Sequence, residues 1–425
     1  MNISDIYSAI DSGAFDRRLL EIYTDREALP YQKQRYLKAL RRYAETFGEE
    51  EVQVYSAPGR SEICGNHTDH QQGEVIAAAI DLDAVGIVRR TEDHCVTLLS
   101  EGYPLIRAEL EDLTPRPEAC GTSAALIRGV AAGFAGKGYR IGGFRAYVTS
   151  DVPGGAGLSS SAAFEILIGT ILSGLYNDGQ VPAEELARIG QFAENTYFGK
   201  PCGLMDQMAC AVGHLVHIDF ADPQKPRWEK LGFDLGRHGY SLCVTDTGGS
   251  HADLTADYAA IPEEMKRVAA FFGREVLLGL GTEDIRENLA ALREQAGDRS
   301  VLRALHCLQE NERVRNMAAA LARDDIAAFL ENAAASGNSS AKYLQNLYAP
   351  ADVRHQPMTL ALALSEALLG NDGVCRVHGG GFAGTVQAFV RTEKAAAYRE
   401  AMDRAFGAGA CRILRIRPFG GIRVL

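Results

Sequence analysis

The residues best suited to do chemistry in this chain lie in one glycine- and serine-rich stretch, Ser150–Ala163. Its glycines, among them Gly155 and Gly157, permit a tight turn and a close approach of the backbone to a ligand. Three hydroxyl groups, Ser159–Ser161, then fall in the first turn of a predicted apolar helix that runs to about Tyr176. Unpaired N–H groups and the positive end of the helix dipole at such a turn suit a phosphate. The stretch fits either a phosphate-binding loop or a glycine-rich connector whose first serine caps the helix.

Three common glycine-rich motifs do not match this stretch. It lacks the Gly-Lys-Ser/Thr of a P-loop, the G-x-G-x-x-G spacing of a dinucleotide-binding fold and the G-x-S-x-G elbow of hydrolases. What remains is the pattern P-x-x-x-G-L-S-S-S-A over Pro153–Ala162. This pattern indicates a third class of phosphate loop.

A second candidate is the polar segment Pro58–Gly73, which lies between two predicted strands. Polar loops held by rigid strands are common places for binding groups. Asp69 can accept two hydroxyl protons, and Asn66 and His67 can donate or accept, so these side chains suit a polyol. The alternatives are a metal fragment that includes His70, for which no second ligand cluster is found, and a merely solvated loop.

Two carboxylates and one tyrosine complete the candidates. Glu194 lies late in the predicted helix Pro182–Gly199, where it fits a surface carboxylate or a functional one. Asp206 lies among apolar residues of Lys200–Gly213, and a buried Asp needs a partner. It is therefore either a capping residue or a carboxylate facing a site. Tyr258 fits core packing or a hydroxyl offered to a ligand.

Composition excludes several classes of protein. The chain has 44 Lys and Arg against 55 Asp and Glu, a formal net charge of −11, which argues against nucleic acid as a general partner. No apolar run approaches the roughly 18 residues of a membrane span, so we expect no membrane segment. Nine scattered cysteines without a repeated C-x-x-C indicate reduced thiols and a cytoplasmic protein.

The elements that must position these residues alternate between strands and helices, which predicts an α/β (α+β) protein. A length of 425 residues predicts more than one domain. The polar, turn-rich segment 221–240 indicates a domain edge, and we predict domains over 1–230 and 231–425. A strand pair is expected on either side of this segment, at His214–Phe220 and Ser241–Thr247. The segment 282–345 is strongly helical, and a second glycine loop follows near Gly379–Gly381.

Three stretches together resemble the GHMP small-molecule kinases and, within them, the galactokinase branch. They occur in the family's order and cover most of residues 50–390. The matching residues are Gly59–Asp69, Pro153–Ala162 with Ala193–Glu194 and Pro201–Gln207, and Gly379–Gly384. The resemblance implies a two-domain fold with the site between the domains. The N-terminal domain would be like ribosomal protein S5 domain 2 and the C-terminal domain ferredoxin-like.

The resemblance also implies roles, with ATP and Mg²⁺ as cofactors and a sugar as substrate. ATP phosphates would be held by Gly155, Gly157, Leu158, Ser159, Ser160 and Ser161. Ser161 and Glu194 would ligate Mg²⁺. Asp206 would take or orient the proton of the sugar's anomeric hydroxyl, and Arg60 would stabilise charge on the phosphoryl group. The sugar would be lined by Asn66, His67, Asp69 and Tyr258.

One departure from the family pattern leaves the sugar open. Galactokinases usually read G-E-H-x-D-Y-N, whereas this chain has Asn66 in place of the Glu that faces C6, and His70-Gln71 in place of Tyr-Asn. An amide would not repel a substrate carboxylate, and some plant galacturonic-acid kinases carry a similar D-H-Q run. The sugar is therefore galactose or a relative altered at C6, such as galacturonic acid.

A non-catalytic sugar sensor is the alternative class. Fungal relatives of galactokinase that bind sugar and ATP but regulate a partner typically have an altered serine loop. Here Ser159-Ser-Ser-Ala162, Glu194, Asp206 and Arg60 are all present, which favours an enzyme. The His-Thr-Asp run and the Pro201–Gln207 stretch argue against a mevalonate-type kinase.

Overall fold

The computed structural model describes residues 1–155, 157–249 and 254–425. Ala156, inside the glycine- and serine-rich stretch, lies outside the described residues. So do residues 250–253, in the segment before Tyr258. Three names are used below: the serine loop (Pro153–Ser161), the polar loop (Gly65–Gly73) and the glycine loop (Gly379–Gly384).

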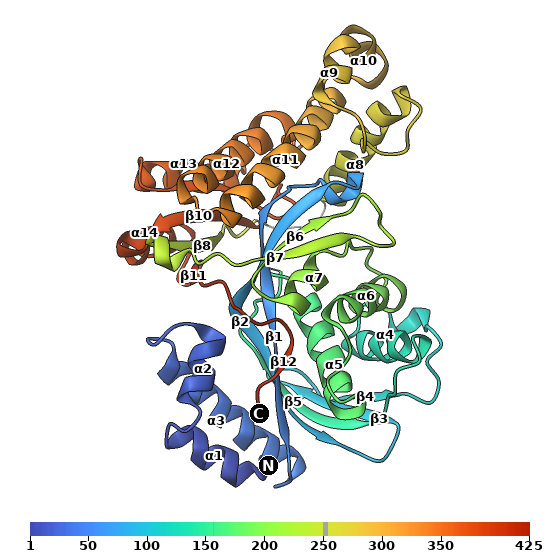
Figure 1. Cartoon of the computed structure of the whole chain (residues 1–425), viewed down its shortest axis with the longest axis vertical. Helices are drawn as coiled ribbons and strands as arrows, with labels where there is room; N and C mark the ends of the chain where they lie inside the picture. The colour runs from blue at the N-terminus through green and yellow to red at the C-terminus, as the bar shows by residue number, and fades with distance from the viewer. Residues whose placement is uncertain (156, 250–253) are drawn as a thin grey trace.

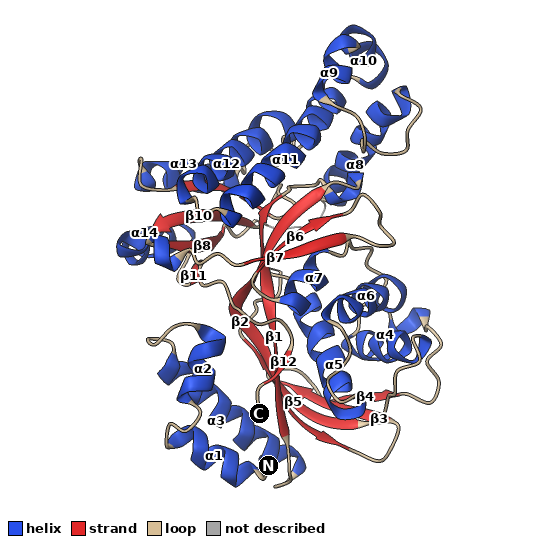
Figure 2. Ribbon diagram, viewed as in Figure 1, coloured by secondary structure: helices blue, strands red, loops and turns tan. Residues whose placement is uncertain are grey.

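The larger sheet is built on two long antiparallel neighbours, β1 and β2 (Figure 2). Its strand order is β12-β1-β2-β5-β3-β4, with β6 also paired to β2 and β7 to β6. Both β1 and β2 are buried along most of their length, because helices cover the two faces of the sheet (Figure 1). Within the described residues its strands are β1 (Gln53–Cys64), β2 (Glu74–Arg90), β3 (Cys95–Ser100), β4 (Ile106–Glu109), β5 (Phe144–Ser150), β6 (Leu215–Asp219), β7 (Arg227–Leu231) and β12 (Ile422–Arg423).

Two helical groups cover this sheet on opposite faces (Figure 1). Helices α4 to α7 pack on one face around apolar residues such as Ile166 and Leu167 of α5. Helices α1 to α3 pack on the other, with Tyr36 and Leu40 against Val85 of β2. Their bounds are α1 (Ile3–Asp11), α2 (Asp16–Tyr23), α3 (Leu29–Phe47), α4 (Ser123–Gly136), α5 (Ser160–Tyr176), α6 (Ala183–Ala193) and α7 (Met205–Val212).

A smaller sheet in the second half of the chain has the order β11-β8-β10-β9. Its strands are β8 (Tyr240–Asp246), β9 (Val374–His378), β10 (Thr385–Arg391) and β11 (Cys411–Leu414). Both strands predicted around segment 221–240 are present, as β6 and β8, but their predicted pairing is wrong, since they belong to different sheets. That segment also holds β7, which pairs with β6 from Leu215↔Leu231 to Asp219↔Arg227.

A layer of helices joins the two sheets. The longest, α11, packs on α12 and α8 and reaches β1 and β2. Its Val314 shares one apolar cluster with Ile76 of the larger sheet and Phe389 of the smaller one, so the junction is a packed core. The helices of this half are α8 (Thr255–Phe271), α9 (Thr282–Glu287), α10 (Leu289–Ala296), α11 (Asp298–Ala322), α12 (Ile326–Ser339), α13 (Pro357–Leu369) and α14 (Thr392–Phe406).

The end of the chain returns to the first sheet. β12 pairs with β1, with Tyr55 opposite Arg423, and Arg417 Nη1 lies 2.7 Å from Asp83 Oδ2 in the core. The domain boundary after residue 230 stays a prediction. The last residues of the chain lie beyond that boundary but pack against the larger sheet. The mixture of sheets and helices agrees with the predicted α/β class. No helix among the described residues is long and apolar enough to cross a membrane.

Candidate active site

The serine loop ends at α5, which begins at Ser160 rather than at Ser159. Ser159 has a left-handed backbone (φ 59°), and its side chain makes no capping hydrogen bond to the helix. Its hydroxyl donates instead to Asp206 Oδ2. The alternative in which the first serine only caps the helix is therefore wrong, because Ser159 ties the loop to α7.

Glycine is required where the serine loop meets the smaller sheet. Gly157 has a φ of 67°, and a Cβ atom there would lie 3.0 Å from Thr385 Oγ1. Gly155 also has a positive φ, of 78°. The loop thus adopts backbone angles that favour glycine, as the sequence predicted.

Arg60 and Asp206 form the best-defined ion pair of the site. Arg60 Nε lies 2.7 Å from Asp206 Oδ1 and Nη2 lies 2.9 Å from Oδ2, a bidentate geometry. Arg60 Nη1 also donates to Gly157 O at 2.5 Å. Burial raises the pKa of Asp206, but the Arg60 charge and the hydrogen bonds from Arg60 and Ser159 more than offset it, so the pKa lies below its usual value. The carboxylate is therefore charged, paired and turned toward the serine loop.

The strand that carries Arg60 extends further than predicted. The sequence indicated a loop from Pro58 onward, but β1 continues to Cys64. It passes Pro58 through a shift of register against β2 between Pro58 and Arg60. Arg60 therefore stands on a rigid strand.

Glu194 lies in a π-helical turn, Glu194–Phe198, that directly follows α6. Such turns are frequent at functional sites. The Glu194 side chain is only 3% exposed, so the surface-carboxylate alternative is wrong. Its Oε1 accepts from Ser161 Oγ at 2.9 Å and lies 3.2 Å from Lys200 Nζ. The structure thus brings together the two residues predicted to hold a metal.

Gln207 binds the other oxygen of Glu194 and is itself bound by Glu165, and the sequence assigned no role to either. Gln207 Nε2 donates to Glu194 Oε2 at 2.9 Å and to Glu165 Oε2 at 3.0 Å, which uses both of its N–H groups. Burial and the charge of Glu194 raise the pKa of Glu165 well above its usual value. The available signal was a lone Glu in the otherwise apolar helix α5.

Three predicted sugar residues contact consecutive carbonyls of the glycine loop. Asn66 Nδ2 donates to Gly379 O at 2.6 Å, and His67 Nε2 donates to Gly380 O at 2.9 Å. Tyr258 Oη donates to Gly381 O at 2.6 Å, and burial raises the pKa of Tyr258 to about 12. Asn66 and His67 thus hold the glycine loop against the polar loop, and Tyr258 holds it against α8.

Asp69, the fourth predicted sugar residue, lies on the side of the polar loop nearest α7. Its carboxylate accepts from the backbone N–H of His70 at 3.0 Å, and its side chain is 19% exposed. A Cβ atom on Gly203 would lie 2.9 Å from Asp69 Oδ2. Gly203 precedes α7 and Asp206 by a few residues, so the polar loop and α7 are neighbours at the site.

The polar loop is held from behind by α11, which the sequence did not reveal. Glu310 Oε1 accepts from Gly65 N at 3.1 Å and Asn66 N at 3.4 Å. His306 Nε2 donates to Asn66 O at 3.0 Å. Burial raises the pKa of Glu310, but the charges of His306, Arg313 and a second arginine hold it at about 2. No local pattern marks these residues in an amphipathic helix.

Asn66 itself is fully enclosed. It is 0% exposed, its Nδ2 donates to Glu62 Oε1 at 3.1 Å, and its Oδ1 accepts from Asn346 Nδ2 at 2.8 Å. Glu62 in turn pairs with Arg376 at 3.0 Å. Asn346, which follows the helical segment, also donates to Gly380 O at 3.1 Å. The amide of Asn66 therefore joins the polar loop to three other parts of the chain.

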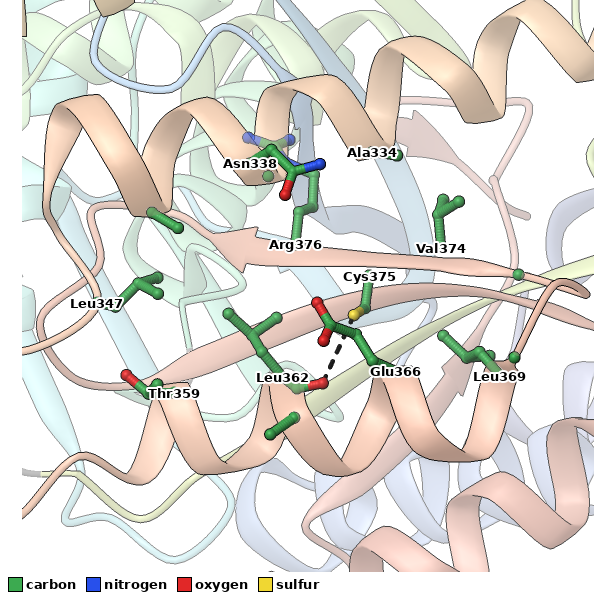
Figure 3. A pocket seen from close by; sticks show the side chains of 15 residues that line it. Ala334, Asn338, Leu347, Thr359, Leu362, Glu366, Leu369, Val374, Cys375 and Arg376 are labelled. Atoms are coloured by element: carbon green, nitrogen blue, oxygen red, sulfur yellow. Dashed lines mark hydrogen bonds between the residues drawn. The ribbon is translucent and has the colours of Figure 1, made fainter.

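Two cavities differ in their relation to this site. One of about 590 Å³ is lined by Pro153, Gly154 and Ser160 of the serine loop, with Phe164 and Tyr103. Another, of about 340 Å³, lies between α12, α13 and β9 (Figure 3). Its lining contains none of the predicted site residues, and Asn338 and Glu366 project into it from the two helices. Only the first cavity adjoins the serine loop.

Two family models match the sequence. The model described as the GHMP kinases N terminal domain matches residues 122–214, which include the serine loop, Glu194 and Asp206. The galactokinase galactose-binding signature matches residues 41–90, which include Arg60 and the polar loop. Both matches fall on the stretches that carried the resemblance.

Curated relatives match over most of their length. A galactokinase of Streptomyces coelicolor is 32% identical over 394 residues, which are 90% of this chain and 97% of that protein. A galactokinase of Clostridium tetani is 29% identical, over 83% of this chain and 87% of that protein.

Solved structures show the same fold. The structure of Lactococcus lactis galactokinase complexed with galactose superimposes with a TM-score of 0.76 at 24% identity, covering 90% of this chain and 98% of that one. A mevalonate kinase superimposes with a TM-score of 0.60 at 14% identity, covering 86% and 99%. The predicted mixed α/β, two-domain fold is confirmed.

Proposed function

The chain belongs to the galactokinase family, and we propose that it transfers the γ-phosphoryl group of ATP to the anomeric hydroxyl of galactose. The observation that carries this proposal is the Arg60–Asp206 pair, which Ser159 joins to the N-terminus of α5. A carboxylate for a hydroxyl proton and a cation for a phosphoryl group thus lie beside a helix end suited to phosphates. This arrangement supports phosphoryl transfer to a sugar hydroxyl.

Asp206 orients the sugar hydroxyl and accepts its proton. The anomeric oxygen bonds to the γ-phosphorus, the bond from that phosphorus to the β–γ bridging oxygen breaks, and ADP leaves with the bonding electrons. Because the pKa of Asp206 is lowered, it is a weak base and takes the proton as the new O–P bond makes the hydroxyl acidic. Arg60 stabilises the charge on the phosphoryl oxygens during this step.

The serine loop and the first turn of α5 hold the phosphates. Gly155 and Gly157 leave the backbone accessible, and Leu158, buried under the loop, fixes it to the core. Ser160 and Ser161 begin α5, and backbone N–H groups in a first helical turn have no intrahelical partner, so they would bind phosphate oxygens. The adjacent cavity of about 590 Å³ is the place for the nucleoside.

Ser161 and Glu194 fit a Mg²⁺ ion. A hydroxyl and a carboxylate are the hard oxygen ligands that Mg²⁺ prefers, and one or two such ligands suffice when phosphates supply others. The ammonium of Lys200 already lies at Glu194 Oε1, which marks this oxygen as a cation position. When bound, the ion neutralises charge on the phosphate oxygens.

We propose galactose rather than a uronic acid. Asn66, which suggested a substrate with a carboxylate at C6, is enclosed and bonded to Glu62. The charge of Glu62 opposes a second carboxylate nearby. The relatives that match 90% and 83% of this chain are also named galactokinase.

We also propose a cytosolic location. All nine cysteines are free thiols, and several are buried. Free thiols are typical of proteins in a reducing compartment.

A sugar panel tests the proposal. ADP release is measured with galactose, glucose, galacturonic acid and 6-deoxygalactose, and ³¹P NMR identifies the phosphorylated position. We expect galactose to give the highest kcat/KM and a 1-phosphate product. Higher kcat/KM with galacturonic acid, or ATP binding without ADP release from any sugar, would overturn it.

A further inference from the structure

A solvent-exposed lysine covers the buried carboxylate that is proposed to hold the metal. Lys200 Nζ lies 3.2 Å from Glu194 Oε1, the oxygen that also accepts from Ser161. The Lys200 side chain is 63% exposed, whereas that of Glu194 is 3% exposed. A buried carboxylate needs a counter-charge, and here a long side chain supplies it from the solvent side.

We propose that Lys200 is a further catalytic residue, whose ammonium neutralises Glu194 before the nucleotide binds and then contacts the phosphates of ATP. This inference rests on the proposed function, in which Glu194 ligates Mg²⁺. A divalent cation at Glu194 repels the ammonium and replaces it on the same oxygen. One cation is thus exchanged for another, and the ammonium becomes free to bind ATP.

The base of the Lys200 side chain is fixed beside the site. Its backbone N–H donates to Glu194 O at 3.2 Å. Two residues further on, the N–H of Cys202 donates to Asn195 Oδ1 at 2.7 Å. These bonds tie the segment to the π-helical turn. The backbone of Lys200 is therefore fixed, while its long side chain can adopt other rotamers.

Lys200 is also within electrostatic reach of Asp206. The charges of Arg60 and, more weakly, Lys200 lower the pKa of the Asp206 carboxyl. In the proposed reaction the phosphoryl group lies between the metal at Glu194 and the sugar hydroxyl at Asp206. The ammonium, in contact with Glu194, therefore also acts on the charge of Asp206.

Arg60 and Lys200 have complementary roles. Arg60 is held by both oxygens of Asp206 and by Gly157 O, which fixes its guanidinium. Lys200 makes one contact with a carboxylate oxygen at the surface of the site. The fixed guanidinium of Arg60 stabilises charge on the reacting phosphoryl group. The less constrained ammonium of Lys200 binds the phosphates of ATP when the nucleotide enters the site.

The test compares Lys200→Met with Lys200→Arg in two measurements. For Lys200→Met we expect the affinity for Mn²⁺ to rise and kcat/KM for ATP to fall. Mn²⁺ binding without nucleotide is measured by electron paramagnetic resonance, and Lys200→Met should bind Mn²⁺ about 3- to 10-fold more tightly, because no ammonium competes for Glu194. In steady-state assays the same variant should lose about 10- to 100-fold in kcat/KM for ATP. Lys200→Arg should retain most of this kcat/KM.

Lys137→Met is the matched control. Lys137 is 53% exposed and pairs with Glu185 at 2.8 Å on the outer helices, so its loss should change neither measurement. Weaker Mn²⁺ binding by Lys200→Met, or an unchanged kcat/KM for ATP, would overturn the inference.

If the wild-type protein phosphorylates no sugar in the panel, the proposed function fails on its own. Calorimetric titration of wild type and Lys200→Met with Mg²⁺ and a non-hydrolysable ATP analogue then replaces the assay. Weaker analogue binding by the variant supports the role of Lys200, and equal binding overturns it.

Discussion

The proposed phosphate end of the site is assembled on one sheet and its helices, whereas the proposed sugar end is assembled from both halves of the chain. The four residues of the phosphate end lie on β1 of the larger sheet and on elements packed against it: Arg60 on β1, Ser161 on α5, Glu194 on the turn after α6 and Asp206 on α7. At the sugar end, Asn66 contacts Gly379, 313 positions further on, and its N–H reaches Glu310 of α11. The sugar end therefore depends on how the two halves of the molecule pack.

The two ends also differ in what occupies their polar groups. At the phosphate end, Ser161 and Lys200 share Glu194 Oε1, and Lys200 is exposed, so an incoming cation has one solvent-exposed contact to displace. At the sugar end, Asn66 and His67 are bonded to the glycine loop. A sugar that binds these side chains has to compete with carbonyls from the other half of the molecule. Sugar binding and the packing of the two halves are thus linked.

The largest expected effect is at Asp206, where the two ends meet. Asp206→Asn keeps the size of the side chain but cannot accept the proton and leaves Arg60 without its counter-charge. We expect kcat to fall about 10²- to 10⁴-fold, measured by ADP release. Calorimetric titration should show sugar binding within a few-fold of wild type. A kcat within 10-fold of wild type would mean that the carboxylate only orients the sugar.

Glu310 tests whether the sugar end depends on α11. The pKa of Glu310 is about 2, below the ordinary 4.5, so its charge stabilises the fold fully above pH 4.5, and this stabilisation is lost as the pH falls toward 2. Glu310→Gln should lower the free energy of unfolding at pH 7 by about 3 kcal/mol. Urea unfolding at pH 7 and pH 3 should show this difference narrowing at the lower pH.

The same variant distinguishes the two ends in kinetics. Among the described residues, Glu310 hydrogen-bonds to the polar loop and to none of the serine loop. Glu310→Gln should therefore raise the KM for sugar and leave the KM for ATP unchanged. Equal increases in both values, or a stability difference independent of pH, would contradict a separate sugar end.

The contrast between the ends also explains what the sequence predicts. The serine loop, Glu194 and Asp206 are found because their glycines, hydroxyls and carboxylates stand out among close neighbours. Glu310 and Asn346 are not found, because their roles arise only from packing of segments hundreds of positions apart. Arg60 was expected in a loop because the segment Pro58–Gly73 is polar and ends in glycine. The strand β1 continues past Pro58 through a register shift, which the sequence does not reveal.

Asn66→Glu tests the enclosed amide at the sugar end. The new carboxylate would face that of Glu62, to which Asn66 Nδ2 now donates, and Gly379 O would lose its N–H donor. We expect a cost of about 1–3 kcal/mol in the free energy of unfolding, measured in urea. Adding Glu62→Gln removes the repulsion between the two carboxylates. The double variant should therefore lose less free energy of unfolding than the two single variants lose together. Strictly additive costs would show that the two side chains do not interact.

The smallest expected effect returns to the phosphate end, at Gly190 of α6. A Cβ atom there would lie 3.1 Å from Gln207 Cγ and 3.2 Å from Glu165 Oε2, so Gly190→Ala presses on the side chains that fix Glu194. The helix gains up to about 1 kcal/mol from replacing glycine, and the crowding offsets it, so stability should change by less than about 1 kcal/mol.

Gly136→Ala on α4 is the control: its new Cβ atom meets no atom within 4 Å, so the substitution should only stabilise the helix. Titration of activity with Mg²⁺ should show that the KM for the metal is a few-fold higher in Gly190→Ala than in wild type. In Gly136→Ala the KM for the metal should be unchanged. An unchanged metal KM in both would mean that Glu194 holds its orientation without Gln207.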